Sequence, residues 1–421
     1  MHIYFSGIGG VGLGPLAEIA LDAGYSISGS DTNSSLMTNE LERRGIHVHL
    51  NQDFRNIAKT HQETPIDWLV YTSALPEDHP ELQFAREHNI KATKRDELLA
   101  FIIKEKELKL IAVAGTHGKT TTTAMLVWLF KRLNIPISYS IGSQISFGPS
   151  GLYDPASKYF VYECDEFDRN FLHFHPFLSL LVSYDYDHPD TYPTRTDYSK
   201  AFSQFLQQSD HVLSWLNEDT TSLKANMNHV TLFDEHATKE EQITLIGSHN
   251  RRNGYLAMAA VNKITKIDFQ KIVNELNDFP GTARRFEKLG NNLYSDYAHH
   301  PAEIAATIQL AKELSDDVVV VYQPHQNSRQ HEVKEQYAHC FNGTKKIYWL
   351  PTYLSRENKE LPLLSPEQLA SSIKSISAIT ADLDEKLWEN IERERQNGVL
   401  VVLMGAGTID DWARKKLLPR T

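Results

Sequence analysis

Residues 110–123 read Leu-Ile-Ala-Val-Ala-Gly-Thr-His-Gly-Lys-Thr-Thr-Thr-Thr and join an apolar run to a loop of glycine, lysine and threonine. The apolar run has the length of a buried parallel strand. Gly115 and Gly118 allow a tight turn whose backbone N–H groups can face phosphate oxygens. Lys119 supplies a positive charge for the β- and γ-phosphates, and Thr120 supplies a hydroxyl for Mg²⁺. The stretch therefore predicts a nucleoside triphosphate site between a strand and a helix.

This loop departs from the strict P-loop pattern, because Val113 stands where that pattern has a glycine five residues before Gly118. We interpret it as a shortened variant. The strand before it and the amphipathic segment 124–133 after it supply the structural context that a phosphate loop requires.

The composition describes an ordinary globular protein of 421 residues, of which 41% are hydrophobic and 23% are charged. The formal net charge is −11 and basic runs are absent, which argues against nucleic acid or an anionic membrane as the main partner. No apolar segment approaches the ~20 residues that span a bilayer, and the N-terminal residues 1–5 leave no room for a signal peptide. With Cys164 and Cys340 as its two cysteines, we expect the protein in a reducing cytoplasm.

Strand-like and helix-like segments alternate along the chain, which is typical of α/β architecture with mostly parallel sheets. A strand runs into a Gly-rich turn three times, after residues 3–6, 110–114 and 399–404. We assign three α/β domains on this basis, at residues 1–106, 107–280 and 281–421.

Near the N-terminus, residues 7–12 read Gly-Ile-Gly-Gly-Val-Gly and match G-x-G-x-x-G between a strand and a helix. Asp31 ends the next strand, about 20 residues later. This pattern predicts a diphosphate at a helix N-terminus and an acidic side chain for a ribose hydroxyl. By itself it suggests NAD, so an NAD-dependent oxidoreductase is the rival hypothesis, although the physics demands only a nucleotide diphosphate.

Four carboxylates occur within residues 163–168, Glu-Cys-Asp-Glu-Phe-Asp, after the strand-like segment 159–161. Such a cluster repels itself unless a cation or water screens it. One interpretation is a solvated acidic loop. The other is a Mg²⁺ site, because Mg²⁺ takes oxygen ligands and the cluster lies in the ATP domain.

Together these motifs resemble those of the Mur ligases, which build the peptidoglycan precursor, and the resemblance covers nearly the whole chain. The shortened loop is similar to the family's ATP loop, and residues 163–168 are similar to its metal-binding run. Residues 185–192, Asp-Tyr-Asp-His-Pro-Asp-Thr-Tyr, resemble a signature whose histidine reaches a second Mg²⁺. The resemblance implies that Thr120, Glu163 and His188 hold Mg²⁺, and that Lys119, Glu163 and His188 are catalytic.

Three further segments resemble family elements that surround ATP. Residues 247–253, Gly-Ser-His-Asn-Arg-Arg-Asn, look like the adenine contact, and residues 279–286, Phe-Pro-Gly-Thr-Ala-Arg-Arg-Phe, look like the hinge before the last domain. Residues 296–301, Asp-Tyr-Ala-His-His-Pro, resemble the element that closes over ATP and the amino acid. The resemblance implies ATP contacts from Gly115, Thr116, His117, Gly118, Lys119, Thr120, Thr121, His249, Asn250, Asn253, Arg284, Asp296 and His299.

The resemblance also implies sites for two other substrates. Residues 323–329, Gln-Pro-His-Gln-Asn-Ser-Arg, are similar to the run whose last arginine would bind the amino-acid carboxylate, although Gln326 replaces a cation that some members carry. The implied amino-acid contacts are Tyr297, His325 and Arg329. The implied contacts of a UDP-sugar are Gly9, Gly10, Val11, Gly12, Ser30, Asp31, Ser73 and Ala74. We expect residues 1–106 to bind that UDP-sugar on their own, through the glycine loop and the helix behind it.

The resemblance thus implies the three-domain Mur ligase architecture: a Rossmann-like N-terminal domain, a central P-loop ATPase domain and a Rossmann-like C-terminal domain. It implies a cytoplasmic ligase, monomeric or homodimeric, that uses ATP and Mg²⁺ to join L-alanine to UDP-N-acetylmuramate through an acyl phosphate. Such a ligase would serve cell-wall synthesis, and through it cell shape and division. The alternatives are a ligase that adds a whole tripeptide to the same UDP-sugar, the oxidoreductase, and a nucleotide-sensing protein without turnover. The ATP loop, the acidic run and His188 disfavour the oxidoreductase.

Overall fold

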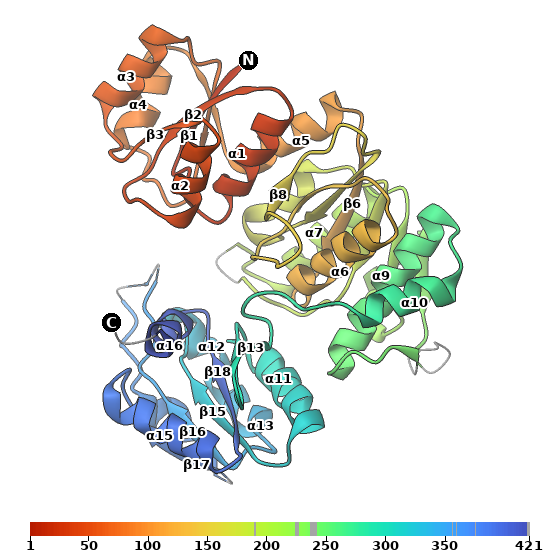
Figure 1. Ribbon diagram of the computed structural model, residues 1–421, viewed down its shortest axis with the longest axis vertical. Helices are drawn as coiled ribbons and strands as arrows, with labels where there is room; N and C mark the ends of the chain where they lie inside the picture. Colours follow the sequence, from red (N-terminus) through yellow and green to blue (C-terminus); the bar gives the residue numbers. More distant parts are fainter. Residues whose placement is uncertain are drawn as a thin grey trace. The chain divides into compact units, whose positions relative to one another are not determined.

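The computed structural model describes residues 1–188, 191–223, 227–235, 242–355, 357–358, 360–374 and 376–418. These residues form α/β layers on three sheets (Figure 1), which confirms the expected fold class. They fall into two compact units, Met1–Ile243 with Asn253–Phe279, and Thr244–Arg252 with Pro280–Thr421. The domain limits assigned from the sequence stay predictions. Pro189 and Asp190, from the signature that contains His188, lie outside the described residues.

The first sheet is parallel throughout, in the order β3-β2-β1-β4-β5. Its central strand β1 is buried at every residue, as expected for a strand with both faces covered. The strands are β1 (His2–Ser6), β2 (Ser26–Ser30), β3 (His47–His49), β4 (Trp68–Tyr71) and β5 (Lys91–Thr93). The helices are α1 (Leu13–Asp22), α2 (Leu36–Arg43), α3 (Phe54–Glu63), α4 (Pro80–Glu87) and α5 (Arg95–Glu105).

The second sheet has the order β12-β11-β10-β6-β9-β7-β8 and is parallel except for the β7–β8 pair. Its strands are β6 (Lys109–Ala114), β7 (Ser138–Ser140), β8 (Gly151–Leu152), β9 (Tyr159–Glu163), β10 (Leu178–Leu181), β11 (Val212–Trp215) and β12 (Val230–Phe233). Its helices are α6 (Lys119–Arg132), the 3₁₀ segment η1 (Phe167–His173), α7 (Arg195–Gln207), α8 (Glu218–Leu223), α9 (Ser248–Thr265) and α10 (Phe269–Asn277). The predicted strand before the ATP loop is thus confirmed as β6, which begins one residue earlier.

The third sheet has the order β13-β14-β18-β15-β16-β17, and β13 is its antiparallel edge. Its strands are β13 (Glu287–Gly290), β14 (Leu293–Asp296), β15 (Val318–Tyr322), β16 (Lys346–Trp349), β17 (Ser377–Thr380) and β18 (Leu400–Met404). Its helices are α11 (Pro301–Leu314), α12 (Asn327–Val333), the 3₁₀ turn η3 (Lys334–Gln336), α13 (Tyr337–Cys340), α14 (Pro366–Ala370), α15 (Glu385–Gln396) and α16 (Ile409–Leu417). The three strands predicted before Gly-rich turns, β1, β6 and β18, therefore lie in three different sheets.

One continuous cluster of buried apolar side chains joins the first two sheets. Leu99 and Ile102 of α5 belong to it together with Leu110 of β6. Helix α1 also packs against β8, where the backbone of Gly151 lies so close to Pro15 that a Cβ atom would not fit. The first two sheets therefore share a core within the first unit.

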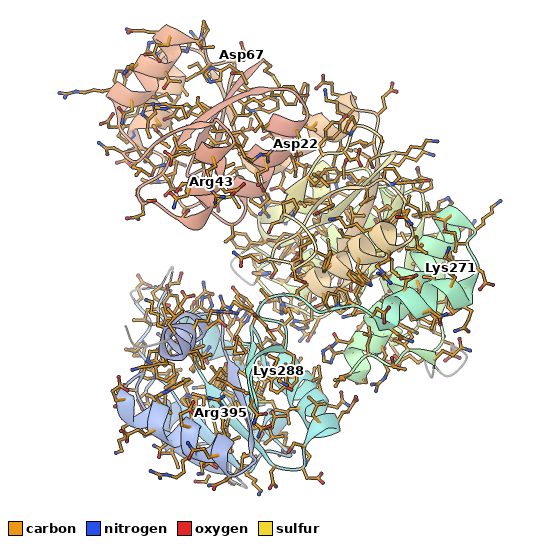
Figure 2. All side chains as sticks on the ribbon, in the orientation of Figure 1. Asp22, Arg43, Asp67, Lys271, Lys288 and Arg395 are labelled. Carbon is orange, nitrogen blue, oxygen red and sulfur yellow. The ribbon has the colours of Figure 1, made fainter. Side chains whose placement is uncertain are left out.

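Charged side chains such as Arg43, Lys271 and Lys288 are exposed at the surface (Figure 2). Both cysteines, Cys164 and Cys340, are buried and unbridged, and burial raises the pKa of the Cys340 thiol to about 12. Within the described part of the chain, no helix combines the length and the apolar character needed to cross a membrane.

Candidate active site

The loop between β6 and α6 turns at the glycines that the sequence predicts. Gly115 has φ +135° and Gly118 has φ +83°, conformations that side chains rarely adopt. A Cβ atom on Gly118 would lie 2.8 Å from the side-chain amide of Asn253, which places that amide against the loop. No side chain caps α6, so its first N–H groups remain directed at the loop. This is the geometry of an anion site.

Lys119 is folded back over this loop. Its Nζ donates to the carbonyl of Gly115 at 2.6 Å and to Oε2 of Glu166 at 2.7 Å. Burial acts to lower the pKa of Lys119, but the neighbouring carboxylates, Glu166 foremost, hold that pKa above its usual value. Burial also raises the pKa of Glu166, and the ammonium of Lys119 opposes that shift. The two side chains form a buried ion pair at the phosphate site.

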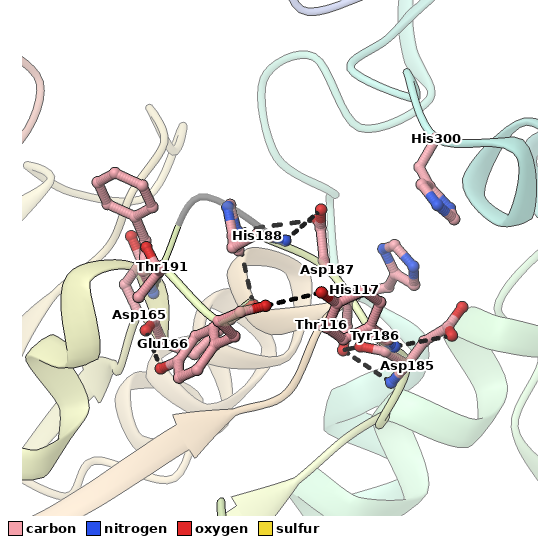
Figure 3. Close-up of polar contacts among 12 residues, drawn as sticks. Thr116, His117, Asp165, Glu166, Asp185, Tyr186, Asp187, His188, Thr191 and His300 are labelled. Carbon is pink, nitrogen blue, oxygen red and sulfur yellow. Dashed lines mark hydrogen bonds and ion pairs between the residues drawn. The ribbon is translucent and has the colours of Figure 1, made fainter. Parts of the chain in front are cut away.

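Glu166 also belongs to a group that includes His188 (Figure 3). Its Oε1 makes no hydrogen bond within the described residues and lies 3.9 Å from Nε2 of His188. Ligand atoms of Asp165, Glu166 and His188 lie within 4.8 Å of one another. Two carboxylates, one with a buried oxygen that lacks a hydrogen bond, and an imidazole are donors that fit a divalent cation.

Thr120 and Glu163, two of the three predicted metal ligands, are in contact. The Thr120 hydroxyl donates to Oε1 of Glu163 at 2.8 Å, and the backbone N–H of Gly142 donates to Oε2 at 3.2 Å. The structure thus brings Thr120 and Glu163 together, and it groups His188 with Asp165 and Glu166. Glu166 was missed by sequence reasoning: it stands in the acidic run, but nothing in the spacing shows that it turns toward Lys119.

Thr116 and His117 hold the ATP loop to the segment that follows β10. The Thr116 hydroxyl donates to the carbonyl of Asp185 at 2.6 Å and lies 2.9 Å from the hydroxyl of Tyr198 (Figure 3 shows the Asp185 contact). The N–H of His117 donates to Oγ of Ser183 at 2.7 Å. Both predicted ATP residues therefore also position the loop, and sequence reasoning did not identify their partners.

The glycine loop of the first sheet is held by the end of β2. The carbonyl of Ser30 accepts from the N–H groups of Gly7 and Ile8 at 2.8 and 2.9 Å, and Oδ2 of Asp31 accepts from Gly9 at 2.8 Å. The hydroxyl of Ser30 is fully buried and donates to Glu81 at 2.9 Å. Ser30 therefore supports the loop through its backbone, while the predicted Ser73 and Ala74 are exposed after β4.

Beneath this loop, Glu81 accepts hydrogen bonds from three hydroxyl groups. Tyr4 donates to it at 2.8 Å, and Ser6 and Ser30 donate to its other oxygen. Burial raises the pKa of Glu81, and the three hydroxyls oppose that shift. The sequence indicates Glu81 only as part of a helix start, so its role in fixing the ends of β1 and β2 was missed.

A cavity of about 200 Å³ opens between the glycine loop and the second sheet. Both sides belong to the first unit. The glycine loop contributes Val11 and Gly12, and the second sheet contributes Glu163, the partner of Thr120. The remaining lining residues are Leu16, Arg95, Leu99, Ser140, Ile141, Gly142, Tyr162 and Asp165.

In the second unit, Arg284 of the predicted hinge contacts the loop after β18 and the ring of Tyr297. Arg284 donates to the carbonyl of Gly405 at 2.9 Å, and its guanidinium lies 4.7 Å from the ring centre of Tyr297. Asp296 accepts from the N–H groups of Phe286 and Ala298 at 2.7 and 2.8 Å. Burial raises the pKa of Asp296, and Arg285 opposes that shift. Arg284 and Asp296 thus hold Tyr297 in place.

A predicted ATP contact, His299, and a predicted amino-acid contact, His325, meet across two loops of this unit. The rings of His299 and His325 lie 5.7 Å apart, and His325 stacks on Tyr353 at 5.8 Å. Gln326, which precedes α12, has φ +61°, a left-handed conformation for a residue other than glycine. Sequence reasoning missed Tyr353, whose segment lies far along the chain.

A buried chain of polar groups connects these two loops. The hydroxyl of Tyr322 lies 3.0 Å from the carbonyl of His299 and 2.9 Å from the hydroxyl of Tyr337. Tyr337 donates to Oε1 of Gln330 at 2.6 Å, and Nε2 of Gln330 donates to the carbonyl of His325 at 3.0 Å. We call these three side chains, Tyr322, Tyr337 and Gln330, the tyrosine relay. It ties the backbone at His299 to the backbone at His325.

The predicted adenine contacts are divided between the two units. Asn253 belongs to the first unit, whereas His249 and Asn250 belong to the second. The Asn250 amide donates to the carbonyl of Ile246 at 2.9 Å. Burial lowers the pKa of His249 to about 4, so its imidazole is neutral at pH 7. The ligand roles of all these residues stay predictions.

Comparisons with known proteins cover nearly the whole chain. Three family models match it in order: "Mur ligase family, catalytic domain" at residues 2–107, "Mur ligase middle domain" at 113–236, and "Mur ligase, glutamate ligase domain" at 284–407. A UDP-N-acetylmuramate–L-alanine ligase of Clostridium botulinum (strain Kyoto / Type A2) is 32% identical over 97% of this chain and 95% of its own length. The enzyme of the same name from Clostridium acetobutylicum is 30% identical over 97% and 95%.

Solved structures agree on the fold. A UDP-N-acetylmuramate–alanine ligase from Thermotoga maritima matches with a TM-score of 0.76 and 24% identity, over 99% of this chain and 98% of its own. A murein peptide ligase from Psychrobacter arcticus matches with a TM-score of 0.70 and 22% identity over the same shares. The three-domain α/β architecture expected from the sequence is therefore confirmed.

Proposed function

The chain belongs to the Mur ligase family, and on that premise we propose that it joins L-alanine to UDP-N-acetylmuramate with ATP as the energy source. One observation carries the proposal. A single cavity is lined by Gly12 of the glycine loop and by Glu163, which pairs with Thr120 of the ATP loop. A sugar nucleotide on the first loop and a triphosphate on the second would meet at this cavity. An NAD-dependent oxidoreductase would have no use for the second loop.

In the proposed reaction, the carboxylate of the sugar nucleotide attacks the γ-phosphate of ATP, which breaks the bond to the β-phosphate and releases ADP. The amine of L-alanine then loses a proton and displaces phosphate from the acyl phosphate, which forms the amide. Negative charge develops around the transferred phosphoryl group, and Lys119 is suited to balance it. When bound, Mg²⁺ would supply further positive charge at the phosphate oxygens. Thr120 and Glu163 are proposed to hold one Mg²⁺, and His188 a second, with Asp165 and Glu166 beside His188.

The remaining contacts of the substrates follow the expectations from the sequence. Gly9 to Gly12 and Asp31 are proposed for the diphosphate and ribose of the UDP-sugar, and Asn253 for ATP because it lies against Gly118. Tyr297, His325 and Arg329 are proposed for the amino acid, whose carboxylate suits a guanidinium. We also propose a cytoplasmic enzyme that is a monomer or a homodimer.

A substrate panel tests this function. Phosphate release is measured with ATP, Mg²⁺ and UDP-N-acetylmuramate, and with L-alanine, glycine, L-serine or an L-alanyl tripeptide as the amine. We expect release to require the sugar nucleotide and to be fastest with L-alanine. Full release without the sugar nucleotide would refute the ligase, and a preference for the tripeptide would identify the recycling ligase instead.

A further inference from the structure

The cavity at the glycine loop contains a cation with no role so far. Among the described residues that line it, Arg95 alone is positively charged, whereas Glu163 and Asp165 are negatively charged. Arg95 is the first residue of α5, and its Nη1 lies 2.7 Å from the position that a Cβ atom on Gly12 would occupy. The guanidinium is therefore packed directly against the glycine loop.

The guanidinium is held in place from its other side. Its Nε donates to Oδ2 of Asp96 at 3.3 Å, and its Nη2 lies 3.8 Å from Oδ2 of Asp165. Asp96 is itself fixed, because Oδ1 accepts from the hydroxyl of Tyr162 at 2.6 Å. About a third of the Arg95 side chain, 32%, stays exposed. The cation is thus oriented by the protein and still open to a ligand.

The surroundings favour an anion beside Arg95 and nowhere else in the cavity. Helices α1 and α5 both begin here, after Gly12 and Lys94, and neither start has a side-chain cap. Their positive ends add to the charge of Arg95. Glu163, on the wall that the second sheet contributes, would repel an anion from that side.

We propose that Arg95 is a substrate-binding residue that holds an oxyanion of the sugar nucleotide, either its diphosphate or its carboxylate. The proposal rests on the proposed function. A guanidinium can donate two parallel hydrogen bonds to either group, a geometry that a lysine cannot reproduce. An anion held there would lie in the same cavity as Glu163, the partner of the ATP loop.

Calorimetric titration of the full chain tests this role. The variants are Arg95→Gln, which removes the positive charge, and Arg95→Lys, which keeps the charge but cannot donate two parallel hydrogen bonds. Lys94→Gln is the matched control, because Lys94 directly precedes Arg95 in the sequence but forms an ion pair with the exposed Asp168. Each is titrated with UDP-N-acetylmuramate, with UDP-N-acetylglucosamine, which lacks the carboxylate, and with ATP. We expect Arg95→Gln to weaken UDP-N-acetylmuramate about 10- to 100-fold, Arg95→Lys less, and Lys94→Gln not at all.

The two sugar nucleotides identify the anion. If Arg95→Gln lowers the affinity for both sugar nucleotides equally, Arg95 holds the diphosphate. If it lowers the affinity for UDP-N-acetylmuramate alone, Arg95 holds the carboxylate. Unchanged affinity in Arg95→Gln and Arg95→Lys would overturn the role of Arg95 while the proposed function stands. An equal loss of affinity for ATP would also overturn this role, because the substitution would then have disturbed the structure as a whole. Failure of the unaltered protein to bind UDP-N-acetylmuramate would overturn the proposed function itself.

Discussion

At the scale of single residues, the ion pair of Lys119 and Glu166 is a contact that the sequence does not predict. The side chain of Lys119 is 12% exposed and that of Glu166 is 1% exposed, so each charge depends on the other. Removal of one partner from such a pair leaves an uncompensated buried charge. The pair therefore links the stability of the protein to the residue proposed to act on phosphate.

Lys119→Met is expected to lower turnover roughly 10²- to 10³-fold, because it removes a charge that acts in the transition state. It is also expected to lower the free energy of unfolding by about 3–5 kcal/mol, because Glu166 is left buried and unpaired. Denaturant unfolding and phosphate release measure the two effects. The double variant Lys119→Met/Glu166→Gln should regain stability without activity, and a stable, inactive single variant would contradict the pairing.

Because burial keeps His249 neutral at pH 7, we expect the folded protein to lose stability in acid. Its pKa is about 4 in the folded protein because of burial, against an ordinary value of 6.5. Since the unfolded chain takes up the proton first, stability is complete above about pH 6.5 and falls as the pH drops toward 4, by up to about 3 kcal/mol. His249→Gln should flatten this dependence in unfolding measured at pH 7.5 and pH 5. Parallel curves for the two proteins would show that other groups control acid sensitivity.

At the scale of elements, the sequence predicts the strands well where apolar residues run without interruption. The strands β1, β6 and β18 each differ from their predicted limits by one residue. The glycine turns are predictable as well, because φ at Gly115 and Gly118 excludes most other residues. What could not be predicted are contacts between distant segments. The tyrosine relay is an example, because no pattern in the sequence indicates that its three side chains meet.

Tyr337→Phe tests the tyrosine relay. Loss of the hydroxyl leaves Oε1 of Gln330 buried without its donor, which is expected to cost about 1–3 kcal/mol of unfolding free energy. Because the relay fixes the loops of His299 and His325, we expect the KM for L-alanine to rise and the KM for UDP-N-acetylmuramate to stay unchanged. Steady-state kinetics measure this difference. Tyr294→Phe, in the same unit but outside the relay, is the control, and identical kinetics of the two variants would refute the relay's role.

At the scale of the whole molecule, the first two sheets belong to one compact unit and share a core. The sequence predicts that residues 1–106 bind the UDP-sugar on their own, since the glycine loop and α1 lie within them. The structure gives a reason to expect otherwise. Leu99 and Ile102 are 3% and 0% exposed in a core that continues into β6. No single-sequence pattern could show this, because an amphipathic helix does not reveal which sheet covers it.

The fragment 1–106 is therefore expected to be much less stable than the same residues in the full chain, because it exposes the apolar face of α5 to water. We expect it to bind UDP-N-acetylmuramate far more weakly than the full chain, since it lacks the second wall of the cavity. Thermal unfolding and calorimetric titration of both proteins measure this. A fragment that unfolds cooperatively and binds with full affinity would show that the shared core is dispensable.

The close approach of Gly151 to Pro15 has a consequence for inhibitor design. Where α1 meets β8, the two main chains touch, and no change of side-chain rotamer can relieve that contact. Leu16, which follows Pro15, and Ser140, the strand partner of Gly151, line the cavity, so this fixed contact should limit changes in the width of the cavity. A compound locked in the matching shape would then gain more affinity than a flexible analogue with the same groups, because less freedom is lost on binding.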